Sequence, residues 1–476
     1  MSNHYESSPS PSAVGFSILS RRSLLAGAAG IAGVTALAAC GSDEEATPAP
    51  AGTDAPAGTD APAGTDAPAG TDAPAGTDAP AGTDAPTGDA VTFGSNYSDE
   101  KPKAGMAAAI ATTGLNVAIN TIEHNPYQEN FNTYIQQPDD VMCWFAGYRL
   151  RSFASKGVVG DISDVWEGLP DMSEGFKSAS SGLDGKQYFV PMYFYPWAIH
   201  YRKSLFEEKG YEIPVTWDEL ITLCDKMVAD GLIPFSAANG GGWPQMGMFD
   251  MINLRTNGYD FHVSLMGGKE SWTDPKVKQI FTNWATILDY YQPDANGREW
   301  QDGATALGNK ETGMYLLGTF VTSNFDPEAD PEAQAIIDDI DFFAFPEIDP
   351  AHAQDAVEAP IDGFMMAAAP KNVAGAKELL GALGQAAAID AYISVDPSVV
   401  AANAKANTSG YNALQKKSAE LVGAAKYIAQ FLDRDTDPEF ASAVVGKGIS
   451  DFLAAPGDID TILATIEEQK ATYTFE

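Results

Sequence analysis

The chain has 476 residues, of which 65 are acidic and 28 basic, and its formal net charge is −37. This balance argues against nucleic acid as a partner, because phosphates need Lys and Arg. A chain of this length is expected to form two lobes with additional segments. The three cysteines make no disulfide framework and the five scattered histidines have no metal-ligand spacing, so no cofactor or metal is expected.

Residues 1–40 have the features of an export signal. SRRSLL at 20–25 matches a twin-arginine motif, and a weakly apolar run follows it. LAAC at 37–40 matches a lipobox, in which Cys40 receives a diacylglycerol and becomes the mature N-terminus. Two acyl chains give stable anchoring, so we expect a protein on the extracellular face of the cell membrane, periplasmic if an outer membrane exists. The alternative is a plain secretory signal with a chance cysteine.

Residues 41–90 are predicted to be a disordered linker. The hexapeptide AGTDAP repeats six times between Ala51 and Pro86. Nothing in this repeat can bury a core, and its composition is typical of disorder rather than of a solenoid. The linker would hold the folded part away from the membrane.

The folded part begins near Val91 with strands and helices in alternation. Apolar strands are predicted at 115–121 and 141–145, each followed by a helix, which indicates an α/β lobe with a largely parallel sheet. Ligands of such sheets bind in loops at the carboxyl ends of the strands. This rule selects 95–98, 123–125 and 144–148.

An aromatic stretch, YFVPMYFYPW, occupies residues 188–197, and six of its ten residues carry aromatic rings. Rings with polar tips suit a ligand that is both apolar and hydroxylated. We therefore interpret the stretch as the wall of a cleft, with ordinary core packing as the alternative. A strand at 198–201 and a short helix that ends at Gly210 follow it.

A glycine-rich loop, NGGGWP at 239–244, follows a predicted strand at 233–237. A capping box at 216–219 predicts the helix before that strand. The glycines let the backbone come close to a ligand and project Trp243, whereas the Lys-Ser/Thr of a phosphate loop is missing. The long helix that begins at Asp274 carries an apolar stripe, which we assign to the core.

The last part of the chain contains a second crossing between lobes. Apolar strands are predicted at 313–318 and 340–345. The segment EAPIDGF at 358–364 is interpreted as the return crossing, and an apolar strand continues it to Ala369. From Val373 onward the chain is Ala-rich and predicted to be helical.

Several of these stretches resemble the extracellular solute-binding proteins, family 1, of ABC sugar importers. The resemblance covers about Val91 to Glu476 and is strongest in YPWAIHYRKSLFEEKGYEIPVTWDELITLCDKMVADGLIP, which is similar to the lobe-crossing segment. Further similar segments are DDVMCWFAGYRLRSFASKGVVGDISDVW, GYDFHVSLMGGKESWTDPKVK, GMYLLGTF and the crossing at Asp362-Gly363. Many members have Asn or Asp after the strand tyrosine, whereas Arg202 follows Tyr201 here, which indicates a sub-group.

The resemblance implies an α/β, two-lobed periplasmic-binding-protein-like fold of type II, with a hinge between the lobes and a helical C-terminal region. Residues 91–196 would form the first part of lobe 1 and residues 197–358 lobe 2. Residues 359–476 would supply the return crossing, the remainder of lobe 1 and the C-terminal helices. By position, the resemblance places the ligand pocket at Asn96, Tyr97, Glu123, His124, Trp144, Tyr148, Tyr195, Trp197, Trp243 and Asp362.

The implied function is capture of a mono- or oligosaccharide by a membrane-anchored monomer, which delivers it to the membrane subunits of an ABC importer without catalysis. The tryptophans would cover the apolar faces of the sugar, and the carboxylates and Asn96 would bind its hydroxyls. An anchored glycosidase is an alternative, since Glu123 and Asp362 could form its carboxylate pair. A sugar-sensing lipoprotein that acts through a receptor is a third possibility.

Overall fold

A computed structural model describes residues 90–475 of the chain. The predicted export signal, its Cys40 and the AGTDAP repeats lie outside these residues. No helix between residues 90 and 475 has the length and apolar character needed to cross a membrane.

The larger sheet has six strands in the order β11-β4-β10-β3-β1-β2. These strands are β1 Val91–Ser95, β2 Val117–Thr121, β3 Val141–Phe145, β4 Val190–Phe194, β10 Ile361–Met366 and β11 Val400–Ala401. β1 is parallel to β2 and β3, but β10 is antiparallel to β3 and β4, and β11 is antiparallel to β4. The expectation of a largely parallel sheet is therefore wrong. β10 re-enters the sheet from the second lobe at the end where β4 leaves it, so the two strands run in opposite directions.

The smaller sheet has four strands in the order β6-β7-β5-β8. These are β5 Trp197–Arg202, β6 Ile233–Phe235, β7 Thr312–Gly318 and β8 Ile340–Phe343. β5 is central, antiparallel to β7 and β8, and all six of its residues are buried. A third, two-stranded sheet pairs β9 (Ala356–Glu358) in parallel with β12 (Tyr427–Ala429).

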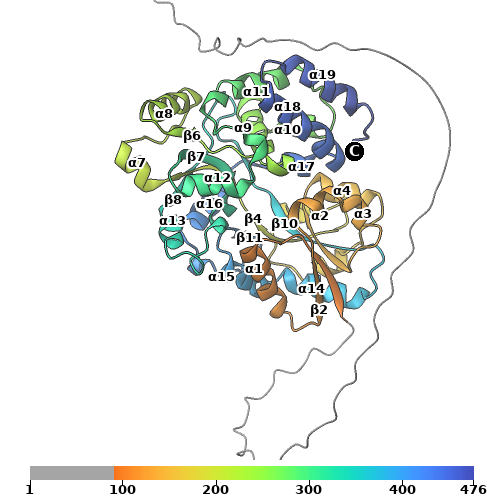
Figure 1. The fold of residues 1–476 in the computed structure, drawn as a ribbon. Helices are drawn as coiled ribbons and strands as arrows, with labels where there is room; N and C mark the ends of the chain where they lie inside the picture. The colour runs from red at the N-terminus through yellow and green to blue at the C-terminus, as the bar shows by residue number, and fades with distance from the viewer. Residues whose placement is uncertain (1–89, 476) are drawn as a thin grey trace, which may run out of the picture. The chain divides into compact units, whose positions relative to one another are not determined.

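Helices surround each of the two larger sheets (Figure 1). Those of the lobe with the six-stranded sheet are α1 Glu100–Ala111, α2 His124–Glu129, α3 Phe131–Tyr134, α4 Tyr148–Ser155, α5 Ser163–Trp166, α6 Glu174–Ala179, α14 Val373–Leu383 and α15 Ala386–Val395. The other lobe has α7 Lys203–Lys209, α8 Trp217–Ala229, α9 Met246–Asn257, α10 Tyr259–Met266, α11 Pro275–Ala285, α12 Trp300–Gly308 and α13 Ala333–Asp339. Short 3₁₀-helices lie at Gly240–Gly242, Leu288–Tyr290, Ala295–Gly297, Thr319–Asn324 and Thr408–Gly410.

The C-terminal segment is largely helical, as predicted. It contains α16 Ala413–Ala424, α17 Leu432–Asp435, a π-helix at Phe440–Gly446, α18 Lys447–Ala454 and α19 Ile459–Lys470. α18 packs against α11 of the four-stranded lobe, with the Phe452 ring edge-on to Phe281 at 4.9 Å between ring centroids. α19 also contacts α11, so α18 and α19 cover the lobe opposite to the one that contains β10, whereas α16 contacts β11 of the six-stranded sheet.

Local signals in the sequence set several of these boundaries. Thr216 and Glu219 form the predicted capping box at the start of α8, and α7 ends at Gly210, whose φ of 61° is the left-handed conformation that glycine favours. Asp274 caps α11 through its side chain. The predicted core stripe of α11 is buried, and Trp284 within it is fully inaccessible.

Candidate functional site

One cavity lies between the two lobes, where β4, β5 and β10 meet. Loops from both lobes and the segment around α17 contribute to its wall. The lining residues are Asn96, Tyr97, Ser98, Asp99, Pro102, His124, Gln128, Tyr193, Tyr195, Trp197, Trp243, Trp300, Phe320, Ser323, Asp362, Tyr392, Asp396, Ser398, Val399, Phe431, Asp433 and Arg434.

The register of β4 and β10 fixes the position of Asp362 in this wall. Asp362 lies opposite Tyr193, and the register shifts between Asp362 and Gly363. A Cβ atom at Gly363 would lie 2.1 Å from the carbonyl oxygen of Val190, so the close approach of the strands requires glycine there. The carboxylate is thus placed by backbone pairing.

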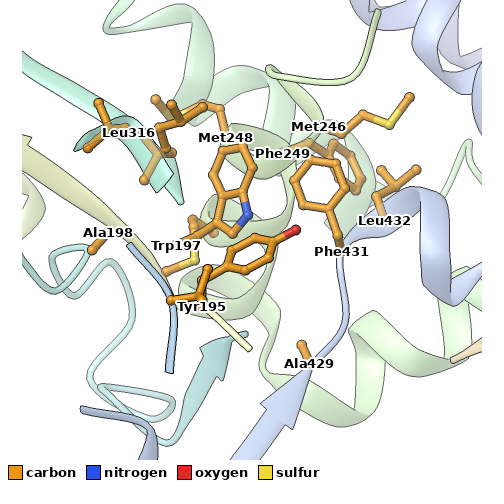
Figure 2. Packing of buried hydrophobic residues seen from close by; sticks show 14 of the residues in the cluster. Tyr195, Trp197, Ala198, Met246, Met248, Phe249, Leu316, Ala429, Phe431 and Leu432 are labelled. Carbon is orange, nitrogen blue, oxygen red and sulfur yellow. The ribbon is translucent and has the colours of Figure 1, made fainter. Parts of the chain in front are cut away.

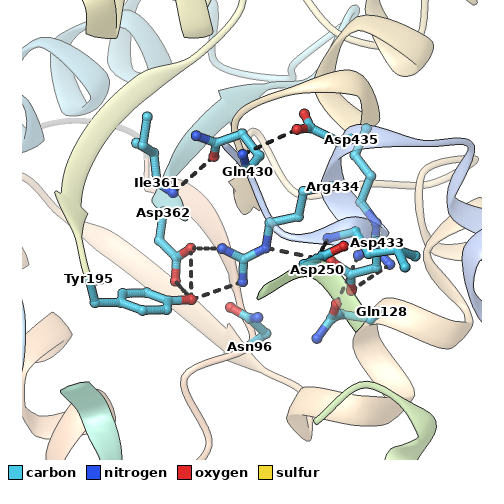
Figure 3. Close-up of polar contacts among 12 residues, drawn as sticks. Asn96, Gln128, Tyr195, Asp250, Ile361, Asp362, Gln430, Asp433, Arg434 and Asp435 are labelled. Carbon is cyan, nitrogen blue, oxygen red and sulfur yellow. Dashed lines mark hydrogen bonds and ion pairs between the residues drawn. The ribbon is translucent and has the colours of Figure 1, made fainter. Parts of the chain in front are cut away.

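Arg434 of α17 holds the Asp362 carboxylate. Its Nη1 donates to Asp362 Oδ1 at 2.8 Å, and its Nη2 donates to the Tyr195 hydroxyl at 2.9 Å, as Figure 3 shows. The guanidinium carbon lies 3.9 Å from the centre of the Phe145 ring. Burial raises the pKa of Asp362, and Arg434 opposes that shift. A buried ion pair is stable only with such additional hydrogen bonds.

A second buried ion pair joins α17 to the first lobe. Arg149 Nη2 lies 3.1 Å from Asp433 Oδ2, and Arg149 Nη1 donates to Gln128 Oε1 at 2.8 Å. Gln128 and Asn96 in turn lie within hydrogen-bond distance of the two ring nitrogens of His124, at 2.7 and 3.2 Å. Burial lowers the pKa of His124 to about 4. The ring is therefore neutral at neutral pH, with one nitrogen that donates and one that accepts.

Two adjacent polar atoms of α17 have no hydrogen-bond partner among the described residues. They are Asp433 Oδ1, an acceptor, and Arg434 Nε, a donor, and both are buried. They lie 3.8 Å apart, which is too long for a hydrogen bond between them. A hydroxyl group both donates and accepts, so its chemistry matches this pair.

Aromatic rings form the apolar part of the wall. The Trp197 indole stacks on Phe431 at 4.7 Å between ring centroids, and Figure 2 shows both rings with their buried neighbours. Trp243 lies edge-on to Trp197 at 6.3 Å between centroids. A Cβ at Gly247 of α9 would lie 2.4 Å from the Trp197 ring. Packing within the protein therefore occupies much of Trp197, whereas Trp243 is partly exposed and has ring surface to offer a ligand.

Tyrosine hydroxyls form another part of the wall. The Tyr193 hydroxyl donates to the Tyr97 hydroxyl at 3.0 Å, and the Tyr392 hydroxyl donates to Asp396 Oδ2 at 3.3 Å. Burial raises the pKa of all three tyrosines well above its usual value. The hydroxyls therefore remain protonated and able to donate.

Seven of the ten predicted pocket residues line this cavity. These are Asn96, Tyr97, His124, Tyr195, Trp197, Trp243 and Asp362. Glu123, Trp144 and Tyr148 do not line it. Glu123 is exposed just before α2, and Tyr148 lines a separate groove beside Phe176 and Val263.

Trp144 is part of a core because of its position in β3. Side chains alternate between the two faces of a strand, so Cys143 joins one buried cluster and Trp144 the other. The Trp144 ring stacks on Phe131 at 3.7 Å and is 2% exposed. Its apolar environment, rather than a ligand, accounts for an aromatic residue at this position.

The cavity residues from α17 and the residue before it were not predicted from the sequence. Phe431, Asp433 and Arg434 line the cavity although they lie more than 60 residues after Asp362 in the chain. The available signal was FLDRD at 431–435, a short charged segment within an otherwise Ala-rich region. Periodicity gives no indication that so short a helix returns to the cleft, because that depends on tertiary packing.

Residues 97–389, more than half of the chain, match the family described as bacterial extracellular solute-binding protein. The chain belongs to this family. The predicted two-lobed type II fold is confirmed by its similarity to solved receptors. One of these is the bacterial solute receptor AcbH, which is 42% identical with a TM-score of 0.77 over 80% of this chain and 98% of that chain. AcbH is described as having an exclusive substrate preference for β-D-galactopyranose.

More distant members of the family are also similar to this chain. The receptor RafE, solved in complex with raffinose, is 17% identical with a TM-score of 0.67 over 80% of this chain and 98% of that chain, and this likeness shows the fold alone. An uncharacterized ABC transporter extracellular-binding protein of Pyrococcus horikoshii is 23% identical over 71% of this chain and 73% of that protein. A probable sugar-binding periplasmic protein of Mesorhizobium japonicum is 26% identical, and the match spans 38% of this chain and 44% of that protein.

Proposed function

We propose that this chain captures a neutral sugar of the galactopyranose type in the cavity between its lobes and delivers it to the membrane subunits of an ABC importer. The observation that carries this proposal is the presence, in one cavity, of partly exposed aromatic surface beside Asp433 and Arg434, two buried, ion-paired residues that each keep a polar atom without a hydrogen-bond partner among the described residues.

A sugar ring matches this combination of groups. A pyranose has an apolar C–H face, which suits the ring of Trp243, and a rim of hydroxyls, which suits Asp433 Oδ1 and Arg434 Nε. Once the cavity is closed, each polar group that a wrong sugar leaves unpaired costs about 1–3 kcal/mol. Selectivity then arises from binding alone, without catalysis.

The relative AcbH supports a galactose-type ligand. It is 42% identical, and the alignment spans 98% of its length. The charges in the cavity also favour a neutral sugar over an acidic one. Arg434 in the cavity wall is already paired with Asp362, and Asp99 and Asp396 add further acidic groups to the wall.

Contacts between the lobes support binding by closure. Trp243 of one lobe lies edge-on to His124 of the other at 6.4 Å between ring centroids, and Lys101 Nζ donates to the carbonyl oxygen of Phe325. A ligand that touches both lobes stabilises the closed state only through contacts that the open state lacks. The hinge would therefore convert sugar binding into a shape that the importer recognises.

The remaining parts of the proposal concern location and assembly. The lipobox at Cys40 and the twin-arginine motif support an exported protein with a lipid anchor and a repeat linker, and we further propose that it acts as a monomer. A glycosidase would need a suitably placed carboxylate pair, and the pair considered from sequence is separated, because Glu123 does not line the cavity and Arg434 binds Asp362.

A ligand screen tests the proposal. The purified folded part is heated with D-galactose, D-glucose, D-mannose, lactose and raffinose, and hits are measured by calorimetry. A ligand that binds only the folded state raises the melting midpoint, so we expect the largest increase with D-galactose. A larger response to raffinose would shift the ligand class to oligosaccharides, and no response to any sugar would contradict the proposal.

A further inference from the structure

Two buried carboxyl groups lie behind the cavity without the partners that charged groups need. They are Asp250 of α9 and Glu358 at the end of β9, and both side chains are fully inaccessible to solvent. Neither oxygen of Glu358 has a hydrogen-bond partner among the described residues, and Asp250 Oδ1 has none. An ionised carboxylate buried in this way is very costly, so the arrangement requires another explanation.

The charged groups around this pair do not neutralise it. His262 of α10 lies 3.8 Å from Asp250 Oδ1 and 3.9 Å from Asp435 Oδ2, but burial lowers its pKa to about 4. α17 carries two more carboxylates, Asp433 and Asp435, whose negative charge raises the pKa of both members of the pair. Three cations face this cluster, and each has a carboxylate other than the pair as its partner. Arg434 is bound to Asp362, Arg149 is paired with Asp433, and Arg151 acts on Asp435.

A proton is the remaining means of neutralising the pair. Among residues 90–475, no three His, Cys, Asp or Glu side chains are arranged to hold a metal ion. Burial raises the pKa of both Asp250 and Glu358 well above its usual value, and at Glu358 the neighbouring Asp250 adds to the shift. Two interacting carboxyl groups in one dry site do not both ionise near neutral pH.

The pair is directly connected to the ligand cavity through α17. Asp250 Oδ2 accepts a hydrogen bond from the backbone N–H of Leu432 at 2.7 Å, and Leu432 is the first residue of α17. The next two residues, Asp433 and Arg434, line the cavity. Figure 3 shows Asp250 beside this helix, with Arg434 extending from it toward Asp362. Asp250 is therefore a positioning residue for the two ion pairs that α17 forms.

We propose that Asp250 and Glu358 hold at least one proton in the ligand-binding form, and that loss of this proton weakens sugar binding by displacing α17. The inference rests on the proposed function for its effect on the sugar, but not for the proton itself. When the pair is fully ionised, it repels Asp433 and Asp435, and α17 moves away from α9. Sugar affinity and stability then both fall as the pH rises.

The test uses Glu358→Gln, which has the shape of the acid and remains neutral at every pH. D-Galactose affinity and the melting midpoint are measured from about pH 6.5 to about pH 9 for the parent, for E358Q and for the exposed-site control Glu378→Gln on α14. A difference of one pKa unit between two states changes affinity tenfold, so we expect the parent to lose roughly three- to tenfold in affinity. E358Q should lose almost none, and E378Q should follow the parent.

If the affinity and the melting midpoint of E358Q depend on pH in the same way as those of the parent, the inference is wrong. If the parent binds no D-galactose even at about pH 6.5, the proposed ligand is wrong. The pH dependence of the melting midpoints of the parent and E358Q then decides by itself whether the pair holds a proton. If E358Q does not fold, Asp250→Asn replaces it, since Asn keeps the acceptor for the Leu432 N–H. Infrared spectra at neutral pH provide a further check. A band from protonated carboxyl groups that is weaker in E358Q than in the parent supports the inference, and equal bands in the two proteins refute it.

Discussion

The Arg434 guanidinium lies 2.8 Å from the Asp362 carboxylate, although one comes from a short C-terminal helix and the other from a central strand. Arg434 also donates to Tyr195, which follows β4. One side chain thus connects α17 to the two strands at which the chain leaves and re-enters the first lobe. Because the chain crosses between the lobes at these strands, changes at this ion pair should affect both ligand affinity and the proposed closure.

Asp362→Asn tests this connection. Asn keeps an acceptor but leaves Arg434 without its balancing charge, so we expect sugar affinity to fall by about 1–3 kcal/mol and the ligand-induced closure seen by small-angle scattering to decrease. Asp289→Asn, at an exposed site, should change neither. Neither parent nor variant should release reducing ends from its best ligand. Steady release by the parent that disappears in D362N would instead support the glycosidase.

Trp243→Ala tests the aromatic surface of the cavity. Trp243 is partly exposed and contacts other rings mainly by their edges. Its loss should weaken sugar binding by roughly 1–3 kcal/mol and leave the melting midpoint without ligand nearly unchanged. Trp284→Ala is the matched control, because this fully buried ring should cost about 3–5 kcal/mol of stability without lowering the affinity of the folded fraction. The opposite pattern at Trp243 would assign that ring to the core.

The sequence predicted the elements that depend on local chemistry. The capping box at Thr216, the left-handed Gly210 and the apolar stripe of α11 are read from neighbouring residues, and all three are present. The loops at 95–98 and 123–125 were located by the rule for strand ends, and Asn96 and His124 line the cavity. The same rule failed at Trp144, because it selects a loop but not the face of the strand.

What could not be predicted depends on contacts between distant parts of the chain. The direction of β10 follows from the path of the return crossing, and the position of Arg434 follows from how α17 packs between α4 and α9. Neither the direction of β10 nor the position of Arg434 produces a periodic pattern in the sequence. The burial of Asp250 and Glu358 was also unforeseen, since isolated acidic residues in a chain of net charge −37 resemble solvated surface.

Trp144→Ala distinguishes the core position of Trp144 from a place in the pocket. Its ring stacks on Phe131 and is 2% exposed, so its removal should lower the free energy of unfolding by about 3–5 kcal/mol. Denaturant titration measures this loss. Sugar affinity, measured by calorimetry at a temperature where the variant remains folded, should equal that of the parent. A loss of sugar affinity with unchanged stability would mean that Trp144 contacts the ligand and does not belong to the core.

Cys40→Ser tests the proposed lipid anchor in cells. Serine cannot receive the thioether-linked diacylglycerol, so the variant should leave the membrane fraction and accumulate as soluble protein or unprocessed precursor. Fractionation and mass spectrometry of the mature N-terminus measure this directly. Ser42→Ala, two residues away, should remain anchored like the parent. A C40S protein that stays in the membrane fraction would show that the lipobox interpretation is incorrect.

His200→Leu tests the effect of a buried histidine on acid stability. His200 lies in β5, is fully inaccessible, and burial lowers its pKa to about 4, whereas an unfolded histidine titrates near 6.5. Between these values the unfolded chain binds more protons than the folded one, so stability falls as the pH falls.

From about pH 8 to about pH 5, His200 alone should remove about 2 kcal/mol of unfolding free energy from the parent. The leucine variant lacks this loss, and the other titrating groups affect both proteins equally. Its stability relative to the parent should therefore be about 2 kcal/mol more favourable at pH 5 than at pH 8. An equal difference at both pH values would mean that His200 titrates with the same pKa in the folded and the unfolded protein.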